Sequence, residues 1–245
     1  APSVFSQKAL VLDNSTGTVL YAKGKLTDRL FPASITKIMT ALVVAENIDD
    51  PDNAVVSVSR KACNLKANAS VMGLKSGDRV SVTDLLYGLL LRSGNDAAIA
   101  LAEFIGGDVS TFVEMMNDKA KELGMNDTCF KNCHGLDEDG HVTSSYDISV
   151  MSRELLTKHP TITKYTTIWM DSLRDGKSQL SNTNKLIKNY KGATGLKTGS
   201  TSLALYNLSA SATRDNLSLI AVIMKAPTTK IRFAEAQKLL DYGFN

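Results

Sequence analysis

A serine and a lysine lie three residues apart, at Ser34 and Lys37, shortly after Pro32. A chain often turns into a helix just after a proline, and residues three apart on a helix share a face. The spacing therefore places a hydroxyl beside an amine at the positive end of a helix dipole. A serine needs a nearby base to become a nucleophile, and a lysine of lowered pKa can be that base. The pair predicts nucleophilic catalysis, with Ser34 as the nucleophile and Lys37 as the general base.

The residues that follow this pair distinguish a catalytic site from the ordinary alternative, a capping serine beside a solvated lysine. Apolar side chains continue to about Asn47, among them Ile38, Met39 and Leu42. A helix that is apolar on most of its faces is buried, so it would hold the pair in the protein interior. We expect a buried helix over residues 34–47.

Two further motifs carry reactive or polar groups. Ser-Gly-Asn at residues 93–95 interrupts two predicted helices, and Lys-Thr-Gly at residues 197–199 lies in a predicted strand. The chain contains no other S-x-N or K-T-G sequence, and residues 34–37 are its only S-x-x-K. K-T-G is uncommon at average amino-acid usage, so its presence after the other two motifs is a strong signal. This is the motif set of penicillin-binding proteins and serine β-lactamases.

The chain resembles the low-molecular-mass penicillin-binding proteins of the D-alanyl-D-alanine carboxypeptidase family. The similarity extends from a hairpin predicted over residues 7–21 to a last helix predicted over residues 228–244, and so covers nearly the whole chain. Five blocks match motifs of that family: residues 32–40, 93–97, 134–137, 182–184 and 195–199. The resemblance implies a serine-type D-Ala-D-Ala carboxypeptidase, which is a hydrolase of the peptidase class.

The resemblance also gives the motif residues catalytic roles. Ser34 would attack the carbonyl carbon between two D-alanines and form an acyl-enzyme, while Lys37 takes the serine proton. Ser93 would pass a proton to the leaving amine, and Asn95 would hold the substrate amide and Lys37. Burial beside a second cation, Lys197, would lower the pKa of Lys37 and leave it partly deprotonated at neutral pH.

The other predicted site residues bind the substrate. By resemblance, the backbone N–H groups of the nucleophile and of Ser200 form the oxyanion hole. Lys197 and Thr198 would receive the terminal carboxylate of the substrate, together with Arg232. Gly199 completes the Lys-Thr-Gly motif. The ordinary alternatives are a solvated strand lysine for Lys197 and a surface helix arginine for Arg232.

The implied reaction removes the terminal D-alanine from peptidoglycan stem pentapeptides, and β-lactams would acylate and inhibit the enzyme. It requires no cofactor and no metal. The implied partners are stem peptides ending in D-Ala-D-Ala and β-lactam antibiotics, within the cell-wall synthesis that shapes the cell. The implied location is extracytoplasmic, in the bacterial cell envelope at the outer face of the cytoplasmic membrane, as for a secreted protein.

Other functions on the same fold stay open. A class A serine β-lactamase also needs a glutamate that activates the deacylating water, and we predict that no glutamate of this chain takes that role. A DD-endopeptidase or transpeptidase would use the same acyl-enzyme. A non-catalytic wall-binding member of the fold is a further alternative, since a fold does not fix a function. Intact Ser34 and Lys37 argue against a non-catalytic protein.

The chain departs from the family in two respects. Family members often continue into a β-rich C-terminal domain and an amphipathic membrane anchor. This chain ends at Asn245, so we expect both to be absent from it and any membrane contact to use a segment outside it. Residues 202–205 are Ser-Leu-Ala-Leu, which is more apolar than the sequence common after Lys-Thr-Gly and affects contacts at the cleft edge.

Composition excludes several classes of protein. With 245 residues, 43% hydrophobic and 22% charged, the chain is an ordinary globular protein. Its net charge of +3 comes without a dense basic block, which argues against a nucleic-acid partner. Three cysteines, Cys63, Cys129 and Cys133, are too few for a disulfide framework. Two of them cluster with His134, but a structural zinc site needs four ligands, so we expect no metal.

Predicted strands lie at both ends of the chain, with predicted helices between them. This order predicts an α+β fold of the β-lactamase/penicillin-binding-protein type, with an antiparallel sheet built from both termini and flanked by helices, plus a mostly helical lobe. We expect a single transpeptidase-like catalytic domain over residues 1–245. Its sheet region would be residues 1–33 and 160–245, its helical lobe residues 34–159, and the active-site cleft would lie between them.

Some elements are predicted in more detail. Four residues should share the sheet: Leu10, Val19, Leu208 and Ile220. Residues 166–183 should form a hairpin of two strands. Thr83 should cap a helix over residues 84–91, and Thr228 should cap the last helix.

Overall fold

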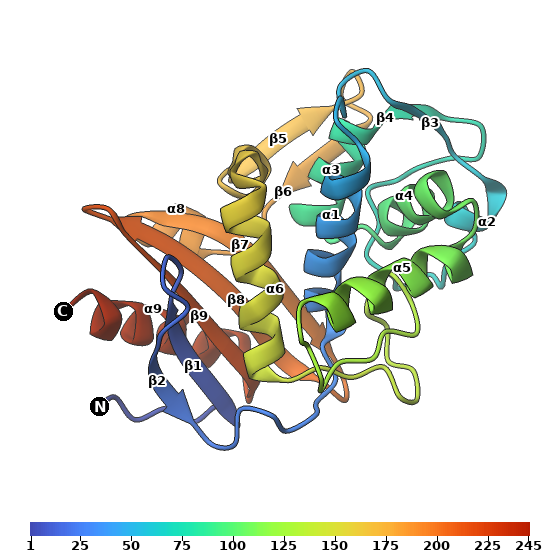
Figure 1. The fold of residues 1–245 in the computed structure, drawn as a ribbon. Coiled ribbons are helices and arrows are strands. Elements are labelled where there is room, and N and C mark those ends of the chain that lie inside the picture. The colour runs from blue at the N-terminus through green and yellow to red at the C-terminus, as the bar shows by residue number, and fades with distance from the viewer.

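The computed structural model describes residues 1–245, and its centre is a five-stranded antiparallel sheet (Figure 1). The strands lie in the order β2-β1-β9-β8-β7. Their bounds are β1 Lys8–Asp13, β2 Val19–Lys23, β7 Ala193–Thr201, β8 Leu205–Arg214 and β9 Leu217–Ala226. Four residues predicted to share this sheet all do so: Leu10, Val19, Leu208 and Ile220. The prediction of a sheet built from both termini is confirmed.

Strand β9 is buried on both of its faces, which explains its unbroken apolar sequence. Alternate residues of a strand point to opposite faces of the sheet. One set packs in the smaller apolar cluster, together with residues of α9 (Thr229–Phe244): Leu219, Ala221 and Ile223. The other set packs in the larger cluster, together with residues of α6 (Ser145–Lys158): Ile220, Val222 and Met224. The sheet is therefore a middle layer, with α6 in front of it and α9 behind it in Figure 1.

Most of the remaining chain is helical. The other long helices are α1 (Thr36–Asn47), α3 (Val82–Leu90), α4 (Asn95–Gly106) and α5 (Val109–Glu122). Shorter turns of helix are η1 (Ala33–Ile35), α2 (Arg60–Cys63), η2 (Pro160–Ile162), α7 (Thr163–Thr166) and α8 (Leu186–Asn189). Two-stranded ribbons pair β3 (Val55–Ser57) with β4 (Arg79–Ser81) and β5 (Met170–Leu173) with β6 (Ser178–Ser181). Helix α1 lies between α6 and α4 (Figure 1).

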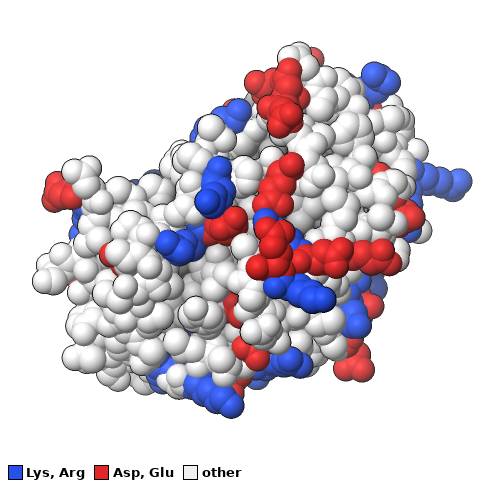
Figure 2. Space-filling model, in the orientation of Figure 1, with Lys and Arg blue, Asp and Glu red and all other residues white.

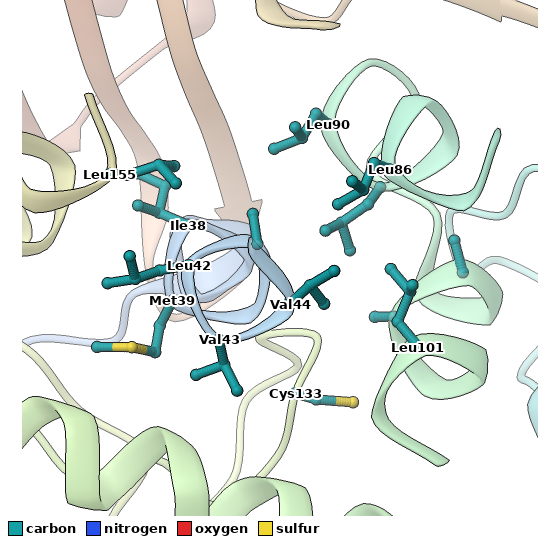
Figure 3. Close-up of a cluster of buried hydrophobic side chains, with 14 of the residues drawn as sticks. Ile38, Met39, Leu42, Val43, Val44, Leu86, Leu90, Leu101, Cys133 and Leu155 are labelled. Atoms are coloured by element: carbon teal, nitrogen blue, oxygen red, sulfur yellow. The ribbon is translucent and has the colours of Figure 1, made fainter. Parts of the chain in front are cut away.

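Helix α1 is the buried helix that the sequence predicts. Nine consecutive residues from Thr36 to Val44 are buried. Figure 3 shows its apolar side chains pointing outward in several directions, toward residues of other elements such as Leu86, Leu101 and Leu155. Burying one such aliphatic side chain stabilises the fold by about 1.5–3 kcal/mol. This packing fixes the start of α1 in the interior of the protein.

Side-chain caps set the starts of several helices. Thr228 accepts a hydrogen bond from the Ile231 amide, so the predicted cap of the last helix is confirmed. The predicted cap at Thr83 is wrong, because Ser81 accepts from the Asp84 amide and α3 begins at Val82. The hydroxyl of Ser81 or that of Thr83 could cap a helix in this sequence. In the structure the Thr83 hydroxyl instead donates a hydrogen bond to the Asp52 carboxylate.

The hairpin predicted over residues 166–183 is present but shorter. It pairs Met170 with Ser181 and stands apart from the five-stranded sheet. The residues before it are helical, because Pro160 opens η2 and α7 continues it. Tyr165 of α7 is buried, with its ring 4.7 Å from that of Tyr87. Because α7 packs on α3 in this way, Thr166 is part of a helix and not the first residue of the predicted strand.

The division into a sheet region and a helical lobe stays a prediction. The larger apolar cluster contains 44 residues and includes α1 residues such as Leu42. The same cluster also includes Leu10, Leu180 and Ile220 from the segments predicted for the sheet region. The two parts therefore share one continuous core.

Charged side chains are spread over the surface. Figure 2 shows Lys and Arg interspersed with Asp and Glu, and a broken line of acidic side chains that runs from the top of the molecule toward its right side. None of the helices combines the length and the apolar character that a bilayer crossing requires.

Candidate active site

A cleft of about 520 Å³ lies between the end of β7 and the helical elements. Its lining includes Ser34 of η1, Asn95 at the start of α4, and Ser200 near the end of β7. Residues 66–70, which connect α2 to β4, contribute to the opposite wall. One residue from each of the first two predicted motifs therefore lines the cavity, and so does Ser200, which directly follows Lys-Thr-Gly. A second cavity of about 530 Å³ lies at the other end of α1, and no predicted site residue lines it.

The predicted nucleophile and base are in hydrogen-bond contact. Lys37 Nζ lies 2.9 Å from Ser34 Oγ, 2.8 Å from Asn95 Oδ1 and 2.7 Å from the carbonyl oxygen of His134. The lysine is fully buried. As an ammonium it donates to all three oxygens. As a neutral amine it donates to Asn95 and His134, and its lone pair is free to accept the Ser34 proton.

Burial favours the neutral form of this lysine. It lowers the pKa of Lys37 to about 7, against the opposing effects of Cys133 and Asp96. Burial also holds the pKa of Lys197 well below its usual range, and the charges of Lys37 and Arg232 lower it further. At neutral pH a large fraction of Lys37 is therefore a free base beside Ser34.

Two glycines allow the backbone to approach the nucleophile closely. A Cβ atom at Gly199 would lie 2.7 Å from the Ser34 backbone nitrogen. A Cβ atom at Gly135, where φ is +99°, would lie 1.9 Å from the Ala33 carbonyl oxygen. Any larger residue would push β7 or the His134 loop away from η1. The third residue of Lys-Thr-Gly thus has a steric reason to be glycine.

The Ser-Gly-Asn turn brings only one of its two polar side chains to Lys37. Asn95 contacts the lysine directly, in the position that the resemblance implies. Ser93 has a φ of +61° and a buried hydroxyl with no hydrogen-bond partner. A non-glycine residue in this left-handed region carries a backbone cost of about 1–3 kcal/mol, of the kind that clusters at functional sites.

The Lys-Thr-Gly strand adds a second buried lysine. Lys197 Nζ donates to the Thr198 carbonyl oxygen at 2.9 Å. The Thr198 hydroxyl lies 2.5 Å from that of Thr183. Asn184 donates to the Gly195 carbonyl oxygen at 2.9 Å and so fixes the start of the same strand. The family block at residues 182–184 therefore holds β7 in place through these two hydrogen bonds.

Arg232 lies beside this strand but is not among the residues that line the cleft. It is 6% exposed, and its Nη1 donates to the Asn207 carbonyl oxygen at 3.2 Å. The guanidinium is 4.7 Å from the Phe233 ring and 5.6 Å from the Tyr206 ring, and its Nε has no partner. Burial lowers its pKa to about 10. Its role toward a carboxylate stays a prediction.

Sequence reasoning missed three contributors to the site. The carbonyl group of His134 cannot be recognised in a sequence, because every residue has one. Asp137 accepts a hydrogen bond of 2.8 Å from Thr201, which ties the family block at residues 134–137 to the end of β7. The buried carboxylate of Asp96 directly follows Asn95 in the second family block. For the two aspartates, the matched blocks were the available signal.

The cysteines form no disulfide. Cys63, Cys129 and Cys133 are all free. Cys133 is buried, and burial raises the pKa of its thiol to about 12. The structure has no group of three His, Cys, Asp or Glu side chains arranged to bind a metal.

The fold and the arrangement of the three motifs are those of penicillin-binding proteins and serine β-lactamases. Residues 1–228 match the D-alanyl-D-alanine carboxypeptidase family. The D-alanyl-D-alanine carboxypeptidase DacF of Bacillus subtilis (strain 168) is 44% identical over 247 residues, covering 98% of this chain and 62% of that protein. Penicillin binding protein 6B from Escherichia coli has a TM-score of 0.94 at 40% identity, covering 100% of this chain and 79% of that chain. A mutant of the Streptomyces K15 DD-transpeptidase has a TM-score of 0.93 at 31% identity, covering 100% of this chain and 99% of that chain.

The chain belongs to the D-alanyl-D-alanine carboxypeptidase family. It spans 62% of the length of the Bacillus subtilis relative.

Proposed function

We propose that the protein is a serine-type D-Ala-D-Ala carboxypeptidase that removes the terminal D-alanine from peptidoglycan stem pentapeptides. The observation that carries this proposal is the 2.9 Å contact between Ser34 Oγ and the buried amine of Lys37, at the edge of the strand that bears Lys-Thr-Gly. The same serine would be acylated by β-lactams.

In the first step, neutral Lys37 takes the Ser34 proton as Oγ bonds to the carbonyl carbon between the two D-alanines. The backbone N–H groups of Ser34 and Ser200 stabilise the negative oxygen that develops. The carbon–nitrogen bond then breaks, and the proton reaches the leaving amine through Ser93. Water attacks the acyl-enzyme in the second step and gives its proton back through Lys37, which restores Ser34. Apart from the water, every nucleophile, proton carrier and hydrogen-bond donor in these two steps belongs to the chain itself.

Substrate recognition rests on positive charge at the carboxylate end of the cleft. Lys197, Thr198 and Arg232 would receive the terminal carboxylate of the substrate. Charge-assisted hydrogen bonds of this kind are stronger than neutral ones. The hydroxyl of Thr183, which contacts that of Thr198, would orient it toward the substrate.

The proposed substrate places the protein outside the cytoplasm. Stem peptides of this kind are part of the bacterial cell wall, so the enzyme would work in the cell envelope at the outer face of the cytoplasmic membrane. Its partners there would be stem peptides and β-lactam antibiotics, in the synthesis of the wall and the maintenance of cell shape.

Release of D-alanine tests the proposal directly. The protein would be incubated with an N-acylated peptide ending in D-Ala-D-Ala, and free D-alanine measured over time. A matched peptide ending in L-Ala-L-Ala should release no alanine. A protein that releases alanine from neither peptide, and that no penicillin labels, would not be an enzyme of this class.

A second outcome, transpeptidation, is favoured by the likeness to the K15 DD-transpeptidase over almost all of that chain. The same acyl-enzyme can pass its acyl group to an amine in place of water. Adding glycine to the assay separates the two reactions, because a transpeptidase would form a new peptide bond to glycine. A hydrolase would release the shortened peptide alone.

The lifetime of the acyl-enzyme separates this protein from a β-lactamase. The penicilloyl-enzyme should persist far longer than the intermediate of a β-lactamase, because no glutamate lines the cleft. The E-x-x-x-N spacing of class A enzymes occurs once, from Glu122 to Asn126. Glu122, however, is exposed at the end of α5 and pairs with Lys119. Stopped-flow measurement with a chromogenic cephalosporin checks this, and turnover of many molecules per second would contradict it.

The mutation Arg232→Ala should impair carboxylate recognition selectively. We expect kcat/KM for a D-Ala-D-Ala peptide to fall about 10- to 100-fold, the effect of a lost hydrogen bond to a charged group. A substrate whose terminal carboxylate is amidated should lose little further activity. Equal losses on both substrates would instead assign Arg232 a structural role.

Arg214→Ala is a matched control for this mutation. Arg214 also stacks on two aromatic rings, with centroids at 4.5 Å for Tyr190 and 4.7 Å for Phe244. Its removal costs similar packing but takes no group from the predicted carboxylate site. The control should therefore lower thermal stability without changing the ratio of the two kcat/KM values.

A further inference from the structure

A buried carboxylate directly follows the Ser-Gly-Asn motif. Asp96 is 2% exposed and lies in the first turn of α4. It has no salt bridge; its charge is balanced by backbone N–H groups at the positive end of a helix. Its Oδ1 accepts from Met72 and Ala97, each at 2.9 Å. Its Oδ2 accepts from Gly73 at 3.1 Å and from Leu74 at 3.0 Å.

Three of these donors belong to the wall of the cleft opposite β7. We call residues 66–74 the cleft wall; it contains no helix or strand, and four of its residues line the cleft: Lys66, Asn68, Ala69 and Ser70. Two further bonds join this wall to the motif. Asn95 donates its amide to the Ser70 carbonyl oxygen at 2.8 Å, and the Ser70 hydroxyl donates to the Arg92 carbonyl oxygen at 2.8 Å.

The carboxylate is the main acceptor for this part of the wall. Met72 and Leu74 are buried, so water cannot replace the oxygens that their N–H groups now contact. Buried donors left without an acceptor are costly. If the carboxylate is removed, the wall must therefore move until water or another group satisfies them. The Ser70 carbonyl moves with it, and this carbonyl holds the backbone of Asn95.

We propose that Asp96 is a positioning residue for the reaction: it holds the cleft wall against the Ser-Gly-Asn turn and thereby keeps Asn95 Oδ1 in contact with the Lys37 amine. This inference rests on the proposed function, because positioning has an effect only if Lys37 is the base. Asp96 itself does not line the cleft.

The charge of Asp96 has a second effect at Lys37, which a purely structural carboxylate would not have. It opposes the burial that lowers the pKa of Lys37. Cys133, in the loop before His134, is a neutral thiol at neutral pH, because burial raises its pKa to about 12. Lys197 faces the same amine from β7, and His134 faces it from the loop through its carbonyl. Removing the Asp96 charge leaves the effect of burial on Lys37 less opposed. The pKa of Lys37 should then fall further, and the acid limb of the rate profile should move to lower pH.

The test compares Asp96→Asn with Asp147→Asn. Asp147 is a matched control, because it too is a buried carboxylate in the first turn of a helix. It accepts from the Asp127 amide at 2.9 Å and the Thr128 hydroxyl at 2.7 Å, in a loop away from the cleft. The second-order rate of acylation by benzylpenicillin would be measured from pH 5 to pH 9, with the melting temperature of each variant.

We expect Asp96→Asn to lower the plateau rate by about 10- to 100-fold, since small displacements of catalytic groups have effects of this size. Its acid limb should move to lower pH. Asp147→Asn should lower the melting temperature and leave both features unchanged. Equal kinetics in the two variants would overturn the proposal, and so would a lower plateau with an unmoved limb, which would assign Asp96 a structural role alone. An unreactive wild-type protein would instead overturn the proposed function.

Hydrogen exchange in the wild-type protein tests the positioning without any variant. The amides of Met72, Gly73 and Leu74 should exchange as slowly as those in the first turn of α4. If they exchange as fast as the exposed amides at residues 66–68, the carboxylate does not hold the wall and the proposal is overturned. This measurement decides the question even if Asp96→Asn fails to fold.

Discussion

The mutation Ser34→Ala should abolish covalent labelling by penicillin and the release of D-alanine while the protein still folds. Only the hydroxyl of Ser34 can form the acyl bond in the proposed reaction, so no residual acylation is expected. Folding should be retained, because Ser34 Oγ accepts only one of the three hydrogen bonds of Lys37. The buried amine keeps Asn95 and His134 as partners.

Mass spectrometry of the penicillin-treated protein checks this prediction. The wild-type adduct should map to the peptide that contains Ser34, and the Ser34→Ala protein should carry none. Ser110→Ala is a suitable control, since Ser110 is an exposed serine of α5 and its loss should leave labelling intact. An adduct on any other serine would contradict the assignment of the nucleophile.

Replacement of Lys37 should slow acylation strongly. Loss of a general base typically lowers the rate by about 10²–10⁴-fold. Lys37→Met keeps most of the side-chain volume and removes the amine, so it is preferred to alanine at a fully buried position. The measurement is the second-order rate constant for acylation by benzylpenicillin.

The pH dependence of the wild-type protein gives the same assignment. Burial lowers the pKa of Lys37 to about 7, so the free base forms as pH rises through this value. The acylation rate should therefore increase from pH 5, pass its midpoint near pH 7 and level off above it. Lys37→Met should remove this rise. A rise that survives the mutation would mean that another group is the base.

Lys119→Met is the matched control for Lys37→Met. Lys119 is also largely buried, and it pairs with Glu46 at 2.6 Å and Glu122 at 3.0 Å, away from the cleft. Its loss should reduce stability without changing acylation.

The two variants should also differ in the pH dependence of stability. Between about pH 7 and pH 10.4 the unfolded chain keeps a proton on Lys37 that the folded protein has lost. The free energy of unfolding should therefore rise with pH in this window, and this contribution should disappear in Lys37→Met.

The sequence predicted those parts of the molecule that depend on side-chain identity. The spacing of Ser34 and Lys37 and the apolar run after them predicted a buried helix, and α1 is buried from Thr36 to Val44. Alternating and continuous apolar runs at the two termini predicted the shared sheet. These features follow from local geometry and burial, which a sequence records directly.

Other features depend on contacts that no local pattern records. Several hydroxyls could cap α3. Ser81 is the cap, and not Thr83, because β4 ends at Ser81 and α3 begins at the next residue. Thr166 is helical because the neighbouring Tyr165 is buried and its ring packs against that of Tyr87. The His134 carbonyl and the Asp96 carboxylate act through backbone groups of distant segments, so their partners appear only once the chain is folded.

The order in which the sheet is built determines when the protein can become reactive during its synthesis. Strand β1 pairs with β9, so Lys8 lies opposite Met224 near the other end of the chain. Strand β7 is joined to β1 only through β8 and β9. A nascent chain can form α1 early, with Ser34 and Lys37 on it, but Gly199 reaches the serine only after β7 has emerged and paired. Contacts between such distant segments also make folding slow. The reactive centre is therefore completed only after β7, β8 and β9 have been made, and a chain interrupted before β9 would carry the nucleophile without a finished site.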